Sequence, residues 1–216
     1  MAWLRWLRGL VLAAATMALS GCLGGGSGSG GGEPIDYMNT TDETSTEALE
    51  RYTVLQNSFA ALNGAAMTLT PTAPSALPTT GAARYDGVMR IANASSTIHG
   101  GLALDVGFAT SRVTGEVTNL RNEFIPIRGA LAIGPADLNR TATGSEPAFR
   151  APLEGRNLNF DTVFYDIEGQ VRGDFADEGR TVILTGAASV DLTAFDETGA
   201  RSTAPRDWGV RAVGTR

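Results

Sequence analysis

Through the second half of the chain, apolar and polar residues alternate, and this alternation limits the fold more than any other feature. In one run, Tyr85, Met89 and Ile91 alternate with Asp86 and Arg90. Successive side chains of a strand point to opposite faces, so a period of two predicts strands with one buried face. About eight such runs follow one another, separated by turn residues. They span 83–92, 101–109, 112–120, 124–133, 148–153, 162–173, 181–190 and 208–213.

This spacing predicts an all-β fold: a single eight-stranded antiparallel up-and-down β-barrel over residues 81–216. Glycines inside the runs indicate sharply curved walls, and Pro126 indicates a bulge, a strand edge or a bend. A barrel embedded in lipid is the alternative. Beyond residue 21 the chain has one tryptophan, Trp208, whereas such barrels carry girdles of aromatic residues. Charged residues also stand between the apolar positions, so we favour a barrel whose exterior is polar and faces water.

The N-terminus has the three parts of a secretory signal. Residues 1–8 are short and basic, and residues 9–20 form an apolar run that ends in small residues. A bilayer-spanning helix needs roughly 20 apolar residues, so a retained membrane anchor is the weaker interpretation. We therefore expect residues 1–21 to be a signal peptide that is removed.

Cys22 is the only cysteine of the chain, and it directly follows this signal. The sequence from Leu19 to Cys22, LSGC, resembles the lipobox of bacterial lipoproteins. The resemblance implies that the Cys22 thiol receives a diacylglyceryl group, that the chain is cut before it, and that the new amino group is acylated, for example by palmitate. Several acyl chains on one residue give stable membrane anchoring. A free thiol or an intermolecular disulfide is the alternative.

Residues 22–43 contain a tract of glycine and serine, which is typical of a flexible tether. The chain has no lysine, so this tract lacks the lysine of a phosphate-binding loop. Leu23, in place of an aspartate, favours onward export to the outer membrane by analogy with enteric bacteria. The cell surface is the expected side rather than the periplasmic face.

Between the tether and the barrel we expect one helix and one linker. Residues 44–64 carry apolar residues at helical spacing, with Thr44 and Glu47 at capping-box spacing and Gly64 as a stop. The predicted apolar stripe consists of Leu49, Tyr52, Leu55, Phe59 and Leu62. Packing of this stripe on the barrel is favoured over a partner-binding or membrane-lying helix, because the polar face is not rich in arginine. Residues 65–80, with three prolines, predict an extended linker.

The charge of the chain argues against nucleic acid as a partner. The net charge is −6, and removal of Arg5 and Arg8 with the signal takes it to −8. Acidic proteins without a basic stripe are poor ligands of nucleic acid. The remaining partners are the membrane, through the lipid anchor, and an unidentified protein or small molecule.

The sequence predicts neither catalysis nor a metal or cofactor. His99 is the only histidine, so a zinc site or a serine–histidine–aspartate triad lacks its parts. We expect His99 in an exposed turn without a role; binding of haem iron or a pH-sensitive contact is the alternative. A solvated hairpin turn explains the cluster of Asp174, Asp177 and Glu178. Alternating strand positions explain Asp161, Asp166 and Glu168.

The barrel region resembles the β-barrel domain of the transferrin-binding protein B family of surface lipoproteins. The resemblance covers 81–190 and rests on glycine-spaced motifs: Tyr85-Asp86-Gly87, LDVGFATSRVTGEV, which contains Asp105, Phe108 and Gly115, and GQVRGDFADEG. In the last motif Gly169, Gly173, Ala176 and Glu178 match the family spacing, whereas Val171 and Arg172 stand where the family has Phe and Tyr.

This resemblance implies a folded barrel on the outer membrane that binds a solute or host factor without catalysis. Iron- or haem-related ligands are included, but transferrin binding is not implied, because the chain has no evident handle domain. Two other classes stay open: a structural or envelope-maintenance lipoprotein without a ligand, and a carrier that holds a hydrophobic molecule inside the barrel. A barrel filled by Leu104, Val106, Phe108, Ile127, Leu131 and Ile133 would disfavour the carrier.

Lipidation at Cys22 predicts both the mass and the location of the mature protein. The intact mass should equal that of residues 22–216 plus acyl groups, and the protein should sediment with membranes. A Cys22→Ser variant should lose the acyl mass and become soluble, because one sulfur carries the anchor. Membrane attachment that survives this substitution after removal of residues 1–21 would contradict the lipid anchor.

Overall fold

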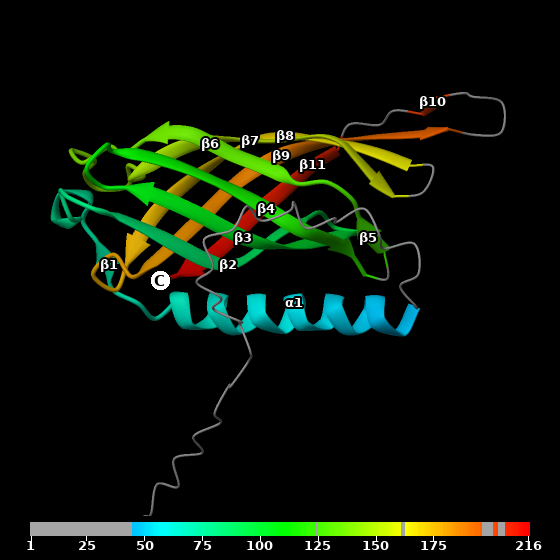
Figure 1. Cartoon of the computed structure of the whole chain (residues 1–216), viewed down its shortest axis with the longest axis horizontal. Coiled ribbons are helices and arrows are strands. Elements are labelled where there is room, and N and C mark those ends of the chain that lie inside the picture. Colours follow the sequence, from blue (N-terminus) through cyan, green and yellow to red (C-terminus); the bar gives the residue numbers. More distant parts are fainter. Residues whose placement is uncertain (1–44, 124, 161–162, 196–200, 203–205) are drawn as a thin grey trace, which may run out of the picture. The chain divides into compact units, whose positions relative to one another are not determined.

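The computed structural model describes residues 45–216 except 124, 161–162, 196–200 and 203–205. The predicted signal, Cys22, the tether and the capping residue Thr44 lie outside the described residues. One helix and a series of strands make up the described part (Figure 1). The elements are α1 (Ser45–Ala66), β1 (Pro71–Thr72), η1 (Pro74–Ala76), β2 (Ala82–Ala92), β3 (Thr97–Gly107), β4 (Arg112–Asn122), β5 (Ile125–Ile127), β6 (Leu131–Asp137), β7 (Phe149–Phe160), β8 (Val163–Ala176), β9 (Thr181–Phe195), β10 (Arg201–Ser202) and β11 (Arg206–Thr215).

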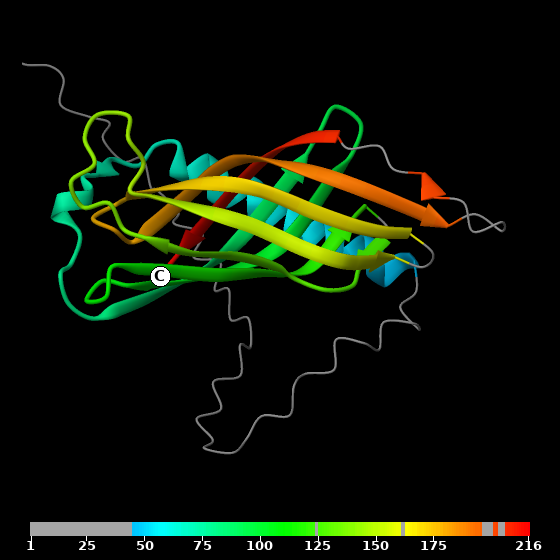
Figure 2. The same cartoon turned by 90° about the horizontal axis from the view of Figure 1, so that it is seen from above.

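Among the described residues, eight strands form a closed antiparallel barrel, which confirms the predicted fold class. The strands follow one another around the wall in chain order: β2, β3, β4, β6, β7, β8, β9 and β11. The last strand pairs with the first, from Gly209 opposite Ala92 to Thr215 opposite Asp86. Seen from above, the strands cross the long axis of the barrel obliquely (Figure 2), as closure of a sheet requires.

The interior of the barrel is filled by the apolar positions of the alternating pattern. The six side chains whose packing would disfavour a carrier all belong to one core cluster, and their exposed fractions are 0–4 %. They are Leu104, Val106, Phe108, Ile127, Leu131 and Ile133. Because close-packed side chains occupy these levels of the barrel, no ligand space is available there.

Helix α1 lies on the outside of the barrel, where it contacts β2, β3 and β11 (Figure 1). Ala48, Tyr52 and Leu55 are buried against the wall, and the outward-facing Val88 and Val213 are buried beneath the helix. The helix therefore packs on the barrel, as predicted. Leu49 is 41 % exposed, so its place in the stripe was wrong. The stripe instead passes through Ala48, one residue earlier. None of the described helices is long and apolar enough to cross a membrane.

The predicted linker covers one end of the barrel rather than merely extending past it. β1 pairs with the end of β8, with Pro71 opposite Ala176. Leu77 is buried and belongs to the barrel core. The Arg140 guanidinium donates hydrogen bonds to the carbonyl oxygens of Leu77, Pro78 and Phe108, at 3.1, 2.7 and 2.8 Å. This end of the barrel is therefore held shut by the segment that precedes it.

Inward-facing glycines allow neighbouring strands to approach closely. A Cβ atom at Gly87, Gly169 or Gly186 would overlap a carbonyl oxygen of the adjacent strand. Only a residue without a side chain fits where two backbones come this close. The glycines in the strand pattern are thus explained by the curvature of the wall.

Two glycine substitutions should have opposite effects on stability. Gly186→Ala should lower the free energy of unfolding by about 1–3 kcal/mol, because the new methyl group overlaps the backbone of Gln170 and Val171. Gly64→Ala should raise it by up to about 1 kcal/mol, because Gly64 lies within α1 with open space around its Cβ position. Urea unfolding of the two variants measures both effects. Equal shifts would contradict the close backbone contact at Gly186.

Candidate functional site

The barrel wall is interrupted between β4 and its neighbour on the β5–β6 side. Pairing of β4 with β6 ends at Val117 opposite Leu131, and pairing with β5 begins at Leu120 opposite Ile127. The predicted strand 124–133 is therefore not continuous, because residues 128–130 leave the ladder. Pro126, for which a bulge, a strand edge or a bend was predicted, lies in the short strand β5, two residues before this segment.

Three residues with positive φ lie on the three neighbouring segments at this interruption. They are Asn119 (φ 52°) on β4, Gly129 (φ 106°) between β5 and β6, and Asn157 (φ 53°) on β7. Asparagine and glycine are the residue types that most readily adopt this conformation. Arg128 turns toward β7 and exchanges backbone hydrogen bonds with Asn159, at 2.7 and 3.0 Å. Bulges of this kind are common next to functional sites, where they redirect side chains.

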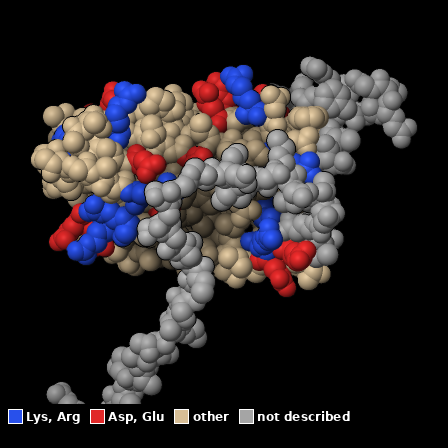
Figure 3. All heavy atoms as spheres, viewed as in Figure 1, with Lys and Arg blue, Asp and Glu red and all other residues tan. Residues whose placement is uncertain are grey.

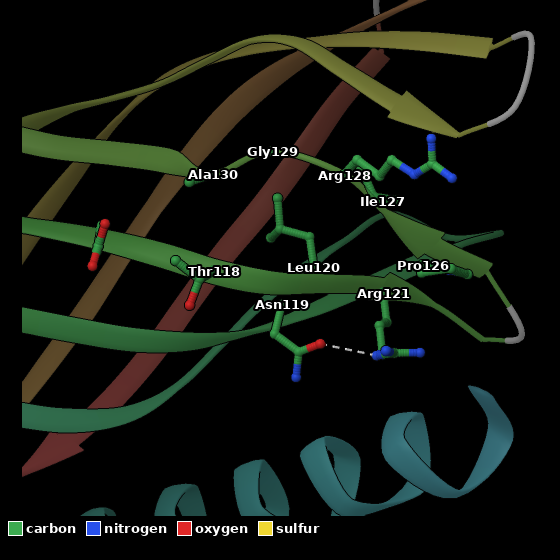
Figure 4. Close-up of a pocket in the computed structure, with 10 residues that line it drawn as sticks. Thr118, Asn119, Leu120, Arg121, Pro126, Ile127, Arg128, Gly129 and Ala130 are labelled. Carbon is green, nitrogen blue, oxygen red and sulfur yellow. Dashed lines mark hydrogen bonds between the residues drawn. The ribbon is translucent and has the colours of Figure 1, made fainter. Parts of the chain in front are cut away.

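A groove of about 320 Å³ opens at this interruption (Figure 4). Its lining includes Leu120 and Ile127, core residues that are 1 % and 4 % exposed. Pro126 adds a further apolar surface. Apolar pockets with few polar groups are the usual form of small-molecule sites. The remaining lining residues are Glu116, Thr118, Asn119, Arg121, Arg128, Gly129 and Ala130.

Two arginines line the β5 end of this groove, which we call the wall groove, and their side chains point apart (Figure 4). Arg121 is 2 % exposed, and its Nε donates a hydrogen bond of 3.1 Å to Oδ1 of Asn119 (Figure 4). Arg128 is exposed and forms no ion pair with any described residue. At the opposite end the carboxylate of Glu116 is one of the charges that raise the pKa of Arg84, after the hydrogen bond and the charge of Asp86.

His99 does not lie in an exposed turn, so that prediction was wrong. It belongs to β3, is 2 % exposed, and points outward under α1. Tyr52 and Phe59 contact its ring edge-on, with centroids 5.2 and 5.8 Å away. Strand β3 begins at Thr97, before the two glycines that follow His99, whereas the predicted strand began at residue 101. A buried histidine under a helix offers haem iron no approach while the helix is in place.

The environment of His99 disfavours its charged form. Burial, followed by the charge of Arg90, lowers the pKa of His99 to about 4. Arg90 and Arg121 are its partners on the two adjacent strands. The Nδ1 atom is buried without a hydrogen-bond partner. His99 is therefore a neutral packing residue between helix and wall, close to two arginines.

The two sets of acidic residues named in the sequence analysis do not line the wall groove, as far as the structure describes them. Asp177 and Glu178 form the β8–β9 turn with positive φ, and Asp166 accepts a hydrogen bond from the backbone of Asn157. Asp161 lies outside the described residues. Within the described ranges, no three His, Cys, Asp or Glu side chains are grouped closely enough to hold a metal ion. On the face shown in Figure 3, basic and acidic side chains are intermixed rather than gathered by sign.

Comparison of the chain with models of known protein families, with curated proteins and with solved structures found no match.

Sequence reasoning did not identify the wall groove. Pro126 and Gly129 inside one apolar run, together with Asn119 and Asn157 near the ends of others, were the available signals. Each is a common local irregularity. Only the pairing of the strands shows that they meet at one place.

The low pKa of His99 predicts a loss of stability in acid. The unfolded chain takes up a proton near pH 6.5, whereas the folded chain does so only near pH 4. The free energy of unfolding should therefore fall as the pH drops from 6.5 to 4. In His99→Phe this contribution should be absent, and at pH 7 the variant should be at least as stable, because the unpaired Nδ1 is removed.

Urea unfolding at several pH values measures this contribution as the difference between the two proteins. Tyr52→Phe, which keeps His99 and an aromatic ring on the helix, should retain the wild-type slope. Parallel curves for wild type and His99→Phe would contradict a neutral, buried His99.

Proposed function

We propose that this protein is a bacterial outer-membrane lipoprotein whose barrel is a non-catalytic binding module for a solute or host factor. Cys22 carries the lipid anchor, and the tether holds the barrel away from the membrane at the cell surface. The lipobox, the glycine- and serine-rich tract and the resemblance to the transferrin-binding protein B family support this proposal. Iron- and haem-related ligands are among the candidates.

The wall groove is the observation that carries the proposal. It lies where the wall leaves regular strand pairing, and the core residues Leu120 and Ile127 form part of its lining. Regular pairing is present on both sides of the interruption. Proteins depart from regular structure mainly where function requires it. The packed interior disfavours a carrier that holds its ligand inside the barrel, and this supports the wall groove as the proposed site.

A ligand screen with two matched tryptophan variants tests this site. Ala130→Trp fills the groove, whereas Ala132→Trp places the same side chain two residues along the same wall, outside the groove. Both positions are exposed. A ligand present at about 100 times its Kd stabilises a protein by about 2.7 kcal/mol, which raises the unfolding temperature by several degrees.

At least one member of a panel of small solutes, hemin included, should raise the unfolding temperature of wild type and Ala132→Trp but not of Ala130→Trp. A shift that persists in Ala130→Trp would place binding outside the wall groove. If no solute or host-factor preparation stabilises the wild type, the alternative of a structural envelope lipoprotein would replace the proposal.

A further inference from the structure

We propose that a second, polar pocket, between α1 and the β2–β3 turn, binds a small zwitterion of the α-amino acid type. The carboxylate of this ligand would face Arg90 and its ammonium group would face Glu123, with the Tyr52 hydroxyl close to both. The pocket shares no lining residue with the wall groove, so this inference goes beyond the proposed function and does not depend on it.

The pocket, which we call the polar pocket, has a volume of about 290 Å³. It lies beside the first turns of α1, blue in Figure 1, at the end of the barrel where β5 lies. Its residues come from α1, from the end of β2 and the turn to β3, and from the end of β4. Apart from Ala94, every described residue of its lining has a polar side chain. A volume close to the lower limit of about 300 Å³ for small-molecule pockets suits one small polar solute.

Hydrogen bonds within the lining hold the walls of the polar pocket in place. The Oδ1 atom of Asn93 accepts hydrogen bonds from the backbone N–H groups of Ser95 and Ser96, both at 2.9 Å. Nδ2 of Asn122 donates to Oγ of Ser96 at 3.0 Å, which ties the turn to the end of β4. A pocket whose walls are already ordered loses less conformational entropy when a ligand binds.

Tyr52 supplies a fixed hydroxyl group without a partner. The residue is 7 % exposed, and its ring packs edge-on against His99. The hydroxyl forms no hydrogen bond with any described residue, although buried tyrosines usually find one. Burial, followed by the charge of Glu123, raises the pKa of Tyr52, so the hydroxyl stays protonated at neutral pH and can donate as well as accept.

Two opposite charges flank this hydroxyl. Arg90 lowers the pKa of Tyr52 whereas Glu123 raises it, so both charges lie near the hydroxyl. Both residues are exposed, and neither forms an ion pair or hydrogen bond with any residue that the structure describes. Arg121, which precedes Asn122 on β4, is not among the lining residues.

The sign of these charges selects the ligand class. Arginine matches a carboxylate through its fork of N–H donors, and the Glu123 carboxylate accepts hydrogen bonds from an ammonium group. A ligand with a single charge would meet one attractive and one repulsive group. A zwitterion is attracted by both, and in an amino acid the two charges lie close enough together for one small pocket.

A screen of amino acids and their capped derivatives tests the ligand class. Thermal unfolding of the mature chain, residues 22–216 with Cys22→Ser, is measured with each common α-amino acid in turn. At least one should raise the unfolding temperature by several degrees. The N-acetyl derivative of that amino acid lacks the positive charge, and its amide lacks the negative charge. Calorimetry should therefore find that each binds about tenfold more weakly than the amino acid.

Two charge variants with matched controls locate the site. Arg90→Gln and Glu123→Gln should each weaken binding of the amino acid about tenfold, because one charge-assisted contact is lost. Arg90→Gln should also abolish the preference over the amide, and Glu123→Gln the preference over the N-acetyl derivative. Arg150→Gln and Glu154→Gln make the same changes at exposed positions of β7, outside the pocket, and should leave the affinity unchanged.

Tyr52→Phe tests the free hydroxyl. It keeps the aromatic ring against His99, so the unfolding midpoint should change little, whereas the affinity for the amino acid should fall about fivefold. An unchanged affinity would show that the hydroxyl does not contact the ligand and would overturn the proposed arrangement.

The remaining outcomes separate this site from the wall groove. If no common amino acid stabilises the wild type, the inference is wrong, and the solute screen decides the proposed function by itself. Equal affinity for the amino acid and both derivatives would overturn the zwitterion. Binding that is lost in Ala130→Trp but kept in Arg90→Gln and Glu123→Gln would support the wall groove and overturn the polar pocket.

Discussion

Pairing of the last strand with the first is the interaction on which the structure depends. β11 lies between β9 and β2 and joins the two ends of the sheet. Closure removes the free edges that would otherwise pair with other chains. It also gives every strand an inner face, which must be filled at the density of a protein core. The buried apolar positions and the inward glycines both follow from this requirement.

The outer face of the barrel differs between the part under α1 and the part at the wall groove. Under α1, Val88 and Val213 are apolar although they point out of the barrel, because the helix keeps water from them. At the wall groove, regular pairing of β4 with its neighbours is instead interrupted. In the described part of the chain, the barrel thus has a side that is covered by a helix of the same chain and a place where its wall departs from regular pairing.

The sequence predicted the regular parts of this fold and missed the irregular ones. The period of two in Leu102, Leu104 and Val106 identifies a strand because each residue obeys the same local rule. The bulge at Asn119 follows no such rule, since it depends on how β4 pairs with two different neighbours. Its place beside Gly129 and Asn157 depends on strand register, which the sequence pattern does not define at bulges.

Two further differences have the same origin in tertiary contacts. His99 precedes two glycines, a local signal for a turn, yet its strand continues because β2 and β4 pair on both sides of it. In the helix, Leu49 and Ala48 fit an amphipathic stripe almost equally well. In the structure Ala48 is buried against the wall and Leu49 is exposed.

The position of α1 has a consequence for the order in which the protein folds. The helix is made before any barrel strand, but its platform consists of β2, β3 and β11. That platform is incomplete until Arg206–Thr215 joins Ala82–Ala92 across most of the chain. Contacts between residues this far apart form slowly, because a long loop must close first. Helix α1 is therefore among the last of the described elements to reach its final place, because it must wait for the C-terminal strand to be synthesised.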